Sequence, residues 1–106
     1  MLRYPGLSVL LLLFLFSTNA FALQSIIGKV TAIEVSYMPE SVRFTLDQGN
    51  TACPAGNVLT WQNANLDNNK AVYAAVTAAL ASGQRIEFFI EDNDQLCKGR
   101  FIYIKP

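Results

Sequence analysis

Residues 58–91, VLTWQNANLDNNKAVYAAVTAALASGQRIEFFIE, hold the succession of elements that decides the fold. The run VLTWQ at 58–62 is rich in β-branched and aromatic side chains, which is typical of a strand. Residues 69–83 have a helical pattern, and residues 84–91 then alternate between polar and apolar side chains as a strand does. We therefore expect a strand, a helix and a second strand in this order.

The two ends of the expected helix carry recognisable signals. Residues 63–69 contain four Asn and one Asp, which favour a turn followed by a helix N-cap. We predict Asp67 or Asn68 as the N-cap. The helix is expected to run to about Ser82 and to end at Gly83, because glycine adopts the left-handed conformation at little cost.

Three further strands flank this segment. GKVTAIEVSY at 28–37, SVRFTLD at 41–47 and RFIYIK at 100–105 alternate in the manner of half-buried strands. A change of apolar parity near Ala32 and Ile33 predicts a bulge or a strong bend, as small barrels require. The order β-β-β-α-β-β predicts a mainly β domain with one helix, the OB-fold, which is a five-stranded, partly open barrel. An SH3-like barrel is the rival, but it usually lacks a helix at this place.

Side chains that share one parity on each element are expected to face the core. On the strands these are Ile33, Val35 and Tyr37, then Val42, Phe44 and Leu46, then Ile86, Phe88 and Ile90, and finally Ile102 and Ile104. On the helix they are Val72, Val76, Ala79 and Leu80, with Tyr73 at the edge. Phe89, Phe101 and Tyr103 have the opposite parity, which leaves open whether they fill a strongly coiled barrel or lie on its surface.

The N-terminus has the features of a secretory signal peptide. Arg3 precedes a short apolar run at 7–16, and Ala-Phe-Ala at 20–22 fits a signal peptidase site. The run is shorter than the roughly 20 residues of a comfortable membrane span. We expect cleavage after Ala22, which leaves 23–106 as one bacterial domain, secreted or periplasmic. An uncleaved N-terminal anchor is the alternative.

The two cysteines, Cys53 and Cys97, both lie in the exported part of the chain. In an oxidising compartment, two cysteines in a small domain most simply form one disulfide. This bridge closes a loop of about 45 residues, which is worth roughly 4 kcal/mol in the chain-entropy model. Free thiols or a metal pair are the alternatives, and the absence of His disfavours zinc.

The composition disfavours several classes of function. The chain has no His, which removes Ser-His and Cys-His nucleophiles and the commonest metal ligand. No cluster of Lys and Arg is present to neutralise the phosphates of a nucleic acid. Carboxylates of a glycosidase are the remaining alternative, but most acidic residues occupy outward strand positions. We expect no enzymatic activity, no metal and no cofactor.

The outer face of the expected helix is almost uncharged. It consists of Ala71, Ala74, Thr77, Ala78 and Ala81. High helix propensity explains such a face, and coverage by a second copy of the chain is the alternative. If Phe89, Phe101 and Tyr103 lie outside, with Trp61 beside them, they form an apolar patch that marks a partner surface. Open strand edges also favour pairing between subunits, so we expect self-association.

Two groups of side chains combine the aromatic, amide and charged groups that sugar sites use. One is Trp61-Gln62-Asn63, next to Asn65. The other is Tyr37, Ser41 and Arg43 around the first turn. OB-folds bind oligosaccharides as well as oligonucleotides. Each group also has an ordinary role, as core, turn or solvated strand.

The exported part of the chain resembles a bacterial family. Its carrying segments are GKVTAIEVSY, SVRFTLDQGNTACPAGN and NNKAVYAAVTAALASGQRIEFFIEDNDQLCKGRFIYI, with one Cys after the second strand and one near the start of the last. They resemble the B subunits of pentameric AB-type bacterial toxins, in particular the family of proteins like the B subunits of subtilase cytotoxin. The resemblance implies a homo-oligomer, a pentameric ring in which edge strands pair and the helices line a pore. It also implies binding of a cell-surface glycan.

In that family a serine just after the first strand holds the sugar, helped by acidic and tyrosine side chains. The resemblance points to Ser41, or else Ser36, with a carboxylate from Glu34 or Asp47 and the phenol of Tyr103. Together with the groups above, the expected ligand-binding residues are Ser41, Tyr37, Arg43, Asp47, Tyr103 and Trp61. No toxin A subunit follows from this chain. The rival function is a monomeric periplasmic binding or inhibitor protein that acts on another protein.

Overall fold

A computed structural model describes residues 22–106. The predicted signal peptide, apart from Ala22, lies outside these residues. The described part contains five strands and one helix in the predicted order β-β-β-α-β-β. They are β1 (Leu23–Glu34), β2 (Val42–Leu46), β3 (Leu59–Trp61), α2 (Leu66–Ser82), β4 (Arg85–Glu91) and β5 (Gly99–Lys105).

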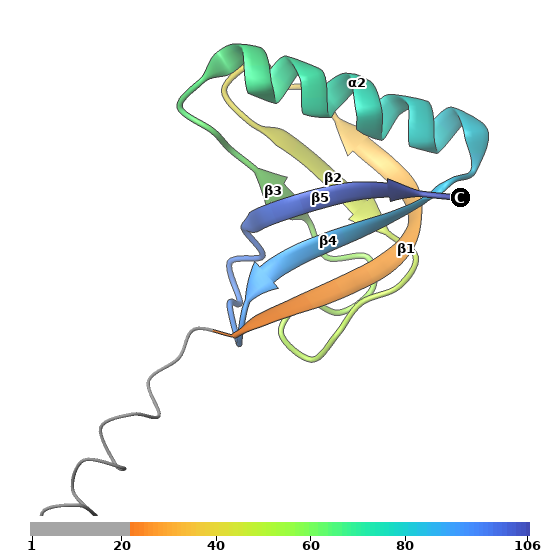
Figure 1. Cartoon of the computed structure of the whole chain (residues 1–106), viewed down its shortest axis with the longest axis vertical. Coiled ribbons are helices and arrows are strands. Elements are labelled where there is room, and N and C mark those ends of the chain that lie inside the picture. The colour runs from red at the N-terminus through yellow and green to blue at the C-terminus, as the bar shows by residue number, and fades with distance from the viewer. Residues whose placement is uncertain (1–21) are drawn as a thin grey trace, which may run out of the picture.

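The strands form one antiparallel sheet in the order β3-β2-β1-β4-β5. A parallel bridge between Thr60 and Lys98 brings β3 to the start of β5, and the Thr60 N–H donates to the Cys97 carbonyl at 3.0 Å. This contact curls the sheet into a small barrel, and α2 lies across one end of it (Figure 1). The predicted OB-fold is confirmed.

β1 is the long strand that both halves of the barrel share. Its residues 23–29 pair with β4, and its residues 30–34 pair with β2. The register shifts between Val30 and Ala32, which confirms the irregularity predicted from the change of parity.

The predicted bounds of this strand, 28–37, are wrong at both ends. β1 begins earlier because its first half is held by β4, a partner that lies far away in the sequence. It ends at Glu34, so Val35 and Tyr37 lie in the following turn with 58% and 53% of their surface exposed.

The core lies between the sheet and α2. It consists of Ile26, Val30, Val42, Phe44, Leu46, Cys53, Leu59, Val72, Val76, Ala79, Ile86, Phe88, Ile90 and Cys97. Phe44 and Phe88 meet edge to face at its centre, with ring centroids 5.2 Å apart, a favoured geometry for aromatic pairs. The predicted inward positions of β2 and β4 are therefore confirmed.

Besides Val35 and Tyr37, two more residues predicted to face the core are exposed. Leu80 is 43% exposed because the buried row on α2 runs through Asn69, Val72, Val76 and Ala79, which leaves Leu80 on its flank. Ile104 is 39% exposed because β5 is the last strand of the sheet and its final residues have a strand neighbour on one side only. Its neighbour Ile102 packs against the core as predicted.

The N-cap of α2 is Asn65, so the prediction of Asp67 or Asn68 is wrong. The Asn65 side chain accepts hydrogen bonds from the N–H groups of Asp67 at 3.0 Å and Asn68 at 3.4 Å, as an N-cap does. Asp67 lies in the first turn, where a carboxylate is favoured by the helix dipole. Gly83 ends the helix as predicted, in the left-handed conformation, and its N–H donates to the Ala79 carbonyl at 2.9 Å.

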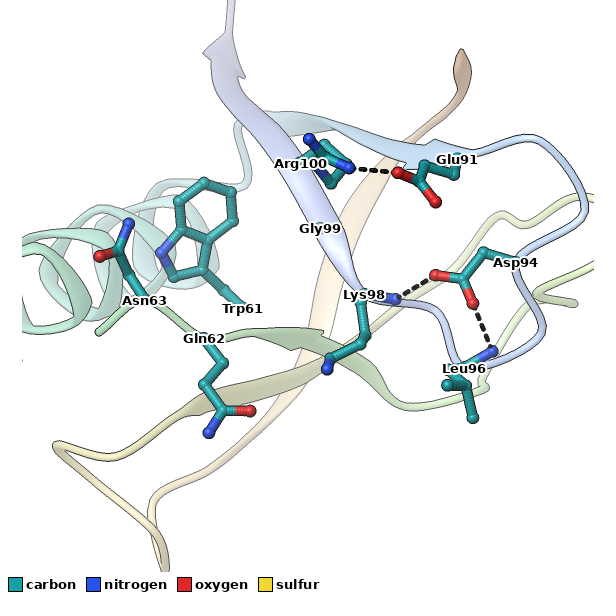
Figure 2. Close-up of a pocket in the computed structure, with 9 residues that line it drawn as sticks. All are labelled: Trp61, Gln62, Asn63, Glu91, Asp94, Leu96, Lys98, Gly99 and Arg100. Atoms are coloured by element: carbon teal, nitrogen blue, oxygen red, sulfur yellow. Dashed lines mark hydrogen bonds and ion pairs between the residues drawn. The ribbon is translucent and has the colours of Figure 1, made fainter. Parts of the chain in front are cut away.

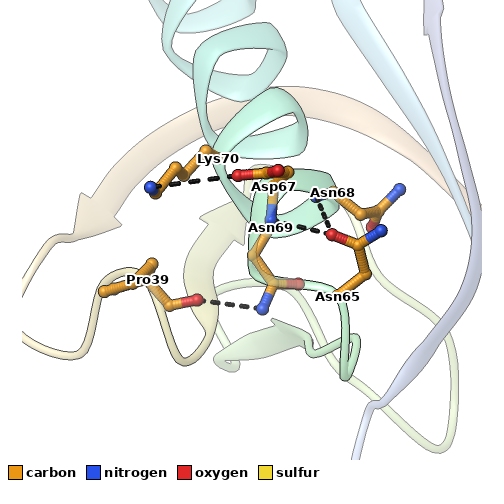
Figure 3. A network of polar contacts seen from close by, with 6 residues as sticks. All are labelled: Pro39, Asn65, Asp67, Asn68, Asn69 and Lys70. Atoms are coloured by element: carbon orange, nitrogen blue, oxygen red, sulfur yellow. Dashed lines mark hydrogen bonds and ion pairs between the residues drawn. The ribbon is translucent and has the colours of Figure 1, made fainter.

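Asn69 is the one fully buried polar side chain with a complete set of partners in the described chain. Its Oδ1 accepts the Asn63 N–H at 2.9 Å, and its Nδ2 donates to the carbonyls of Pro39 at 2.9 Å, Glu40 at 3.1 Å and Asn63 at 2.9 Å. Figure 3 shows the bond to Pro39 reaching from the helix to the turn before β2. One side chain therefore connects α2, the β1–β2 turn and the segment after β3.

Cys53 and Cys97 form the predicted disulfide, with their Cα atoms 6.0 Å apart. The bridge connects the loop after β2 to the loop between β4 and β5. Disulfides are typical of proteins outside the reducing cytosol.

Candidate functional site

A polar pocket of about 500 Å³ opens where β3 and β5 separate beyond their single bridge (Figure 2). On one side it is lined by Trp61, Gln62 and Asn63 at the end of β3. On the other side it is lined by the β4–β5 loop and the beginning of β5. Its volume is within the range of ordinary small-ligand sites.

Trp61 forms the aromatic wall of this pocket and is held in a fixed position. Its Nε1–H donates to Asn68 Oδ1 at 2.9 Å, which ties the half-buried ring to the first turn of α2. Gly99 lets the ring approach β5, because a Cβ there would lie 2.9 Å from Trp61 Cε3 and would clash with the Phe88 ring. The indole is therefore preorganised by two elements.

Two amide side chains follow Trp61 in the chain, and Figure 2 shows Asn63 on the side of the indole and Gln62 on the other side. Gln62 is exposed, and its amide makes no hydrogen bond to any residue of the described chain. Asn63 Oδ1 accepts the Asn65 N–H at 2.9 Å, which leaves the Asn63 amino group directed to solvent or ligand. The pocket thus offers amide donors beside an aromatic surface.

The charged groups of the pocket are unequally satisfied. Asp94 uses both carboxylate oxygens, accepting the Leu96 N–H at 2.9 Å and the Lys98 N–H at 3.1 Å. Glu91 forms an ion pair with Arg100. The Lys98 ammonium has no ion-pair partner within residues 22–106.

A second cluster surrounds the β1–β2 turn. The Arg43 guanidinium lies over the Tyr37 ring, 5.4 Å from its centroid, within the range of a cation–π contact. Arg43 Nε is also 3.3 Å from Glu34 Oε1. Ser41 closes the turn with its N–H on the Tyr37 carbonyl at 3.1 Å, but only 9% of the residue is exposed. Tyr37 and Arg43 therefore lie together on the surface, and Ser41 lies behind them.

Asp47 and Tyr103 lie away from both clusters. The Asp47 carboxylate accepts the Lys29 N–H at 2.8 Å at the far end of β2. Tyr103 lies on the outer face of the β4–β5 hairpin, where it meets Phe89. The six expected ligand-binding residues thus occupy four places, and the structure does not bring them into one site.

The aromatic residues of opposite parity lie on the surface. Phe89 meets Phe101 and Tyr103 edge to face, with centroids 6.4 Å and 5.6 Å apart. Phe101 is 50% and Tyr103 is 54% exposed, and Leu23 and Ile27 of β1 add exposed apolar surface on the same face. We call Leu23, Ile27, Phe89, Phe101 and Tyr103 the aromatic face. Trp61 does not belong to it, because it packs against the core beside α2.

Sequence reasoning missed the basic side of the pocket. Lys98 and Arg100 come directly after Cys97 and flank Gly99. The sequence feature that could have pointed to them is the expected disulfide, because it fixes Cys97 and so makes the residues next to Cys97 candidates for a rigid site. What was lacking was the knowledge that the barrel closes at Thr60 and Lys98.

No protein-family model, curated protein or solved structure matches the chain. Between residues 22 and 106, no three His, Cys, Asp or Glu side chains gather in a way that could hold a metal ion. In the same range, no helix is long and apolar enough to cross a membrane.

Proposed function

We propose that this chain is an exported, non-enzymatic OB-fold subunit that self-associates and binds a glycan. The observation that carries the proposal is the pocket between β3 and β5, in which a fixed indole lies beside solvent-directed amides. The resemblance to toxin B subunits suggests the same two properties. The disulfide supports export, and the predicted cleavage after Ala22 places the mature N-terminus at the start of β1.

The chemistry of the pocket suits a sugar. One face of a pyranose ring is apolar and packs on an aromatic side chain, while its hydroxyls exchange hydrogen bonds with amides. Trp61 supplies the first kind of contact, and Gln62 and Asn63 supply the second. Because Asn68 already holds the indole, the Trp61 side chain loses little conformational entropy when a ligand binds.

The aromatic face and β5 support self-association. β5 has exposed apolar side chains on both of its faces, Phe101 and Tyr103 on one and Ile104 on the other. A strand that is apolar on both sides is typical of strands covered on both sides. Its charged neighbours are already paired, since Lys105 lies 3.1 Å from Glu87 and Arg100 pairs with Glu91. Contact between copies then meets little charge repulsion.

The uncharged face of α2 fits the same assembly. Ala71, Ala74, Thr77, Ala78 and Ala81 belong to the outer side of the helix in the single chain, so they are accessible to a neighbour. In a pentameric ring of the toxin B type, helices line the pore and this face approaches other subunits. Propensity alone remains the explanation if the protein is a monomer.

Light scattering coupled to size-exclusion chromatography, followed by a glycan array, tests the proposal on the mature, oxidised protein. We expect a mass near five subunits and glycan signals that Trp61→Ala abolishes. Tyr37→Ala serves as the matched aromatic control, because its ring lies in the β1–β2 turn away from the pocket. A monomer at micromolar concentrations would refute the ring. An array that is silent, or unchanged by Trp61→Ala, would refute glycan binding at this pocket.

The second candidate is a monomeric periplasmic binding or inhibitor protein. The exposed aromatic face favours it, because such patches also serve contacts with other proteins. A monomeric mass together with loss of partner capture in Phe101→Ser would support this function over the ring.

A further inference from the structure

We propose that the pocket between β3 and β5 selects a sugar that bears a carboxylate, a uronic acid unit, and that Lys98 is the residue that reads the charge. This inference rests on the proposed glycan function and assigns its ligand class. It follows from how the charged groups of the pocket are satisfied.

Each acidic group of the pocket already has a partner from the chain. Both oxygens of Asp94 accept backbone N–H groups, from Leu96 at 2.9 Å and Lys98 at 3.1 Å. Glu91 pairs with Arg100. Both carboxylates therefore have structural roles in the loop and the hairpin, and only Glu91 is also paired with a cation.

The groups that remain are mostly donors. Lys98 has no ion-pair partner in the described chain, Asn63 keeps its amino group, and Gln62 has an uncommitted amide. Figure 2 shows the side chains of Lys98 and Gln62 extending to one side of the pocket, whereas those of Trp61 and Asn63 extend to the other. A ligand that meets these groups needs acceptors, and one anionic acceptor suits the ammonium.

The backbone that carries Lys98 is fixed on three sides. Its N–H is bound by Asp94, the preceding Cys97 is held by the disulfide, and the Cys97 carbonyl accepts the Thr60 N–H. Cys97 also has a positive φ, a left-handed conformation that is uncommon for residues other than glycine. Strained backbone that the surroundings hold in place is frequent at ligand sites. The backbone that carries the cation is therefore held in place.

Trp61 decides between a sugar acid and a simple anion. A small anion such as acetate contacts Lys98 alone and gains nothing from the indole. A uronic acid that spans the pocket contacts Trp61 and Asn63 on one side and Gln62 and the Lys98 ammonium on the other. A neutral hexose uses all of these except the charge.

The test is a fluorescence titration of the mature, oxidised protein. Trp61 is the only tryptophan of the sequence, so its emission reports the pocket directly. Glucuronate, glucose and acetate are titrated at matched ionic strength, because salt screens an exposed charge. We expect glucuronate to bind about tenfold tighter than glucose, in line with one charge-assisted hydrogen bond, and acetate to leave the emission unchanged.

Variants of Lys98 test whether this residue causes the preference for glucuronate. Lys98→Gln should reduce the affinity for glucuronate to that for glucose, and Lys98→Arg should retain the preference. Lys105→Gln is the matched control, since Lys105 pairs with Glu87 away from the pocket. Equal binding of glucuronate and glucose would overturn the carboxylate inference and leave glycan binding intact. Binding of acetate as tight as that of glucuronate would also overturn it, and no response to either sugar would overturn the pocket's glycan role as well.

Discussion

Replacing Asn69 by alanine should destabilise the domain more than any other single change of a polar side chain. The residue is 0% exposed and connects three segments through four hydrogen-bond contacts. Nδ2 has two hydrogens for three acceptors, so these contacts amount to about three full bonds. With a net value of about 1 kcal/mol for each bond, the loss is about 3 kcal/mol. For a domain of this size that lowers the melting temperature by about 12 to 24 °C.

Thermal and urea unfolding followed by circular dichroism measure this loss. Asn57→Ala is the matched control, because Asn57 is exposed and only its backbone N–H makes a hydrogen bond. Asn69→Asp separates hydrogen bonding from volume: it keeps the shape but places a carboxylate against the carbonyls of Pro39, Glu40 and Asn63, and should cost at least as much as alanine. If Asn69→Ala loses less than about 1 kcal/mol, the buried network does not hold the three segments together.

Three further changes test other parts of the fold and the assembly. Asn65→Ala should cost about 1 kcal/mol in chemical unfolding, whereas Asn65→Asp should be nearly neutral, because only the second keeps an N-cap acceptor. Replacing Cys53 and Cys97 together by alanine should cost about 4 kcal/mol and weaken the Trp61 response to sugar, since the loop before β5 loses its anchor; an unchanged midpoint would contradict this. Phe101→Glu should convert the proposed oligomer to monomers in light scattering without lowering the melting temperature, and a persistent oligomer would exclude the aromatic face as the interface.

The order of elements and the disulfide could be predicted from the sequence because they depend on local patterns. Alternation marked β2 and β4, and Gly83 marked the end of the helix. The two cysteines allowed one pairing only. The irregularity in β1 could also be predicted, because the apolar residues of this strand change from one parity to the other in the sequence.

Long-range contacts explain what the sequence did not reveal. The first half of β1 has no strong strand signal of its own and is held in place by β4. Among four neighbouring asparagines, local pattern could not distinguish the N-cap Asn65 from the buried Asn69, whose partners include the distant carbonyls of Pro39 and Glu40 in the β1–β2 turn. Lys98 could not be assigned to the candidate site from the sequence, because it lies there only through the bridge between Thr60 and Lys98 that closes the barrel.

The division of β1 between two partners sets an order of events during synthesis. Residues 30–34 can pair with β2 as soon as that hairpin emerges, but Leu23 must wait for Glu91. Contacts between distant segments form slowly because a long loop must close first. The N-terminal half of β1, with Ile26 and Ile27, therefore stays without its β4 partner until most of the chain has been synthesised. During that interval its apolar side chains and unpaired backbone are open to non-native contacts.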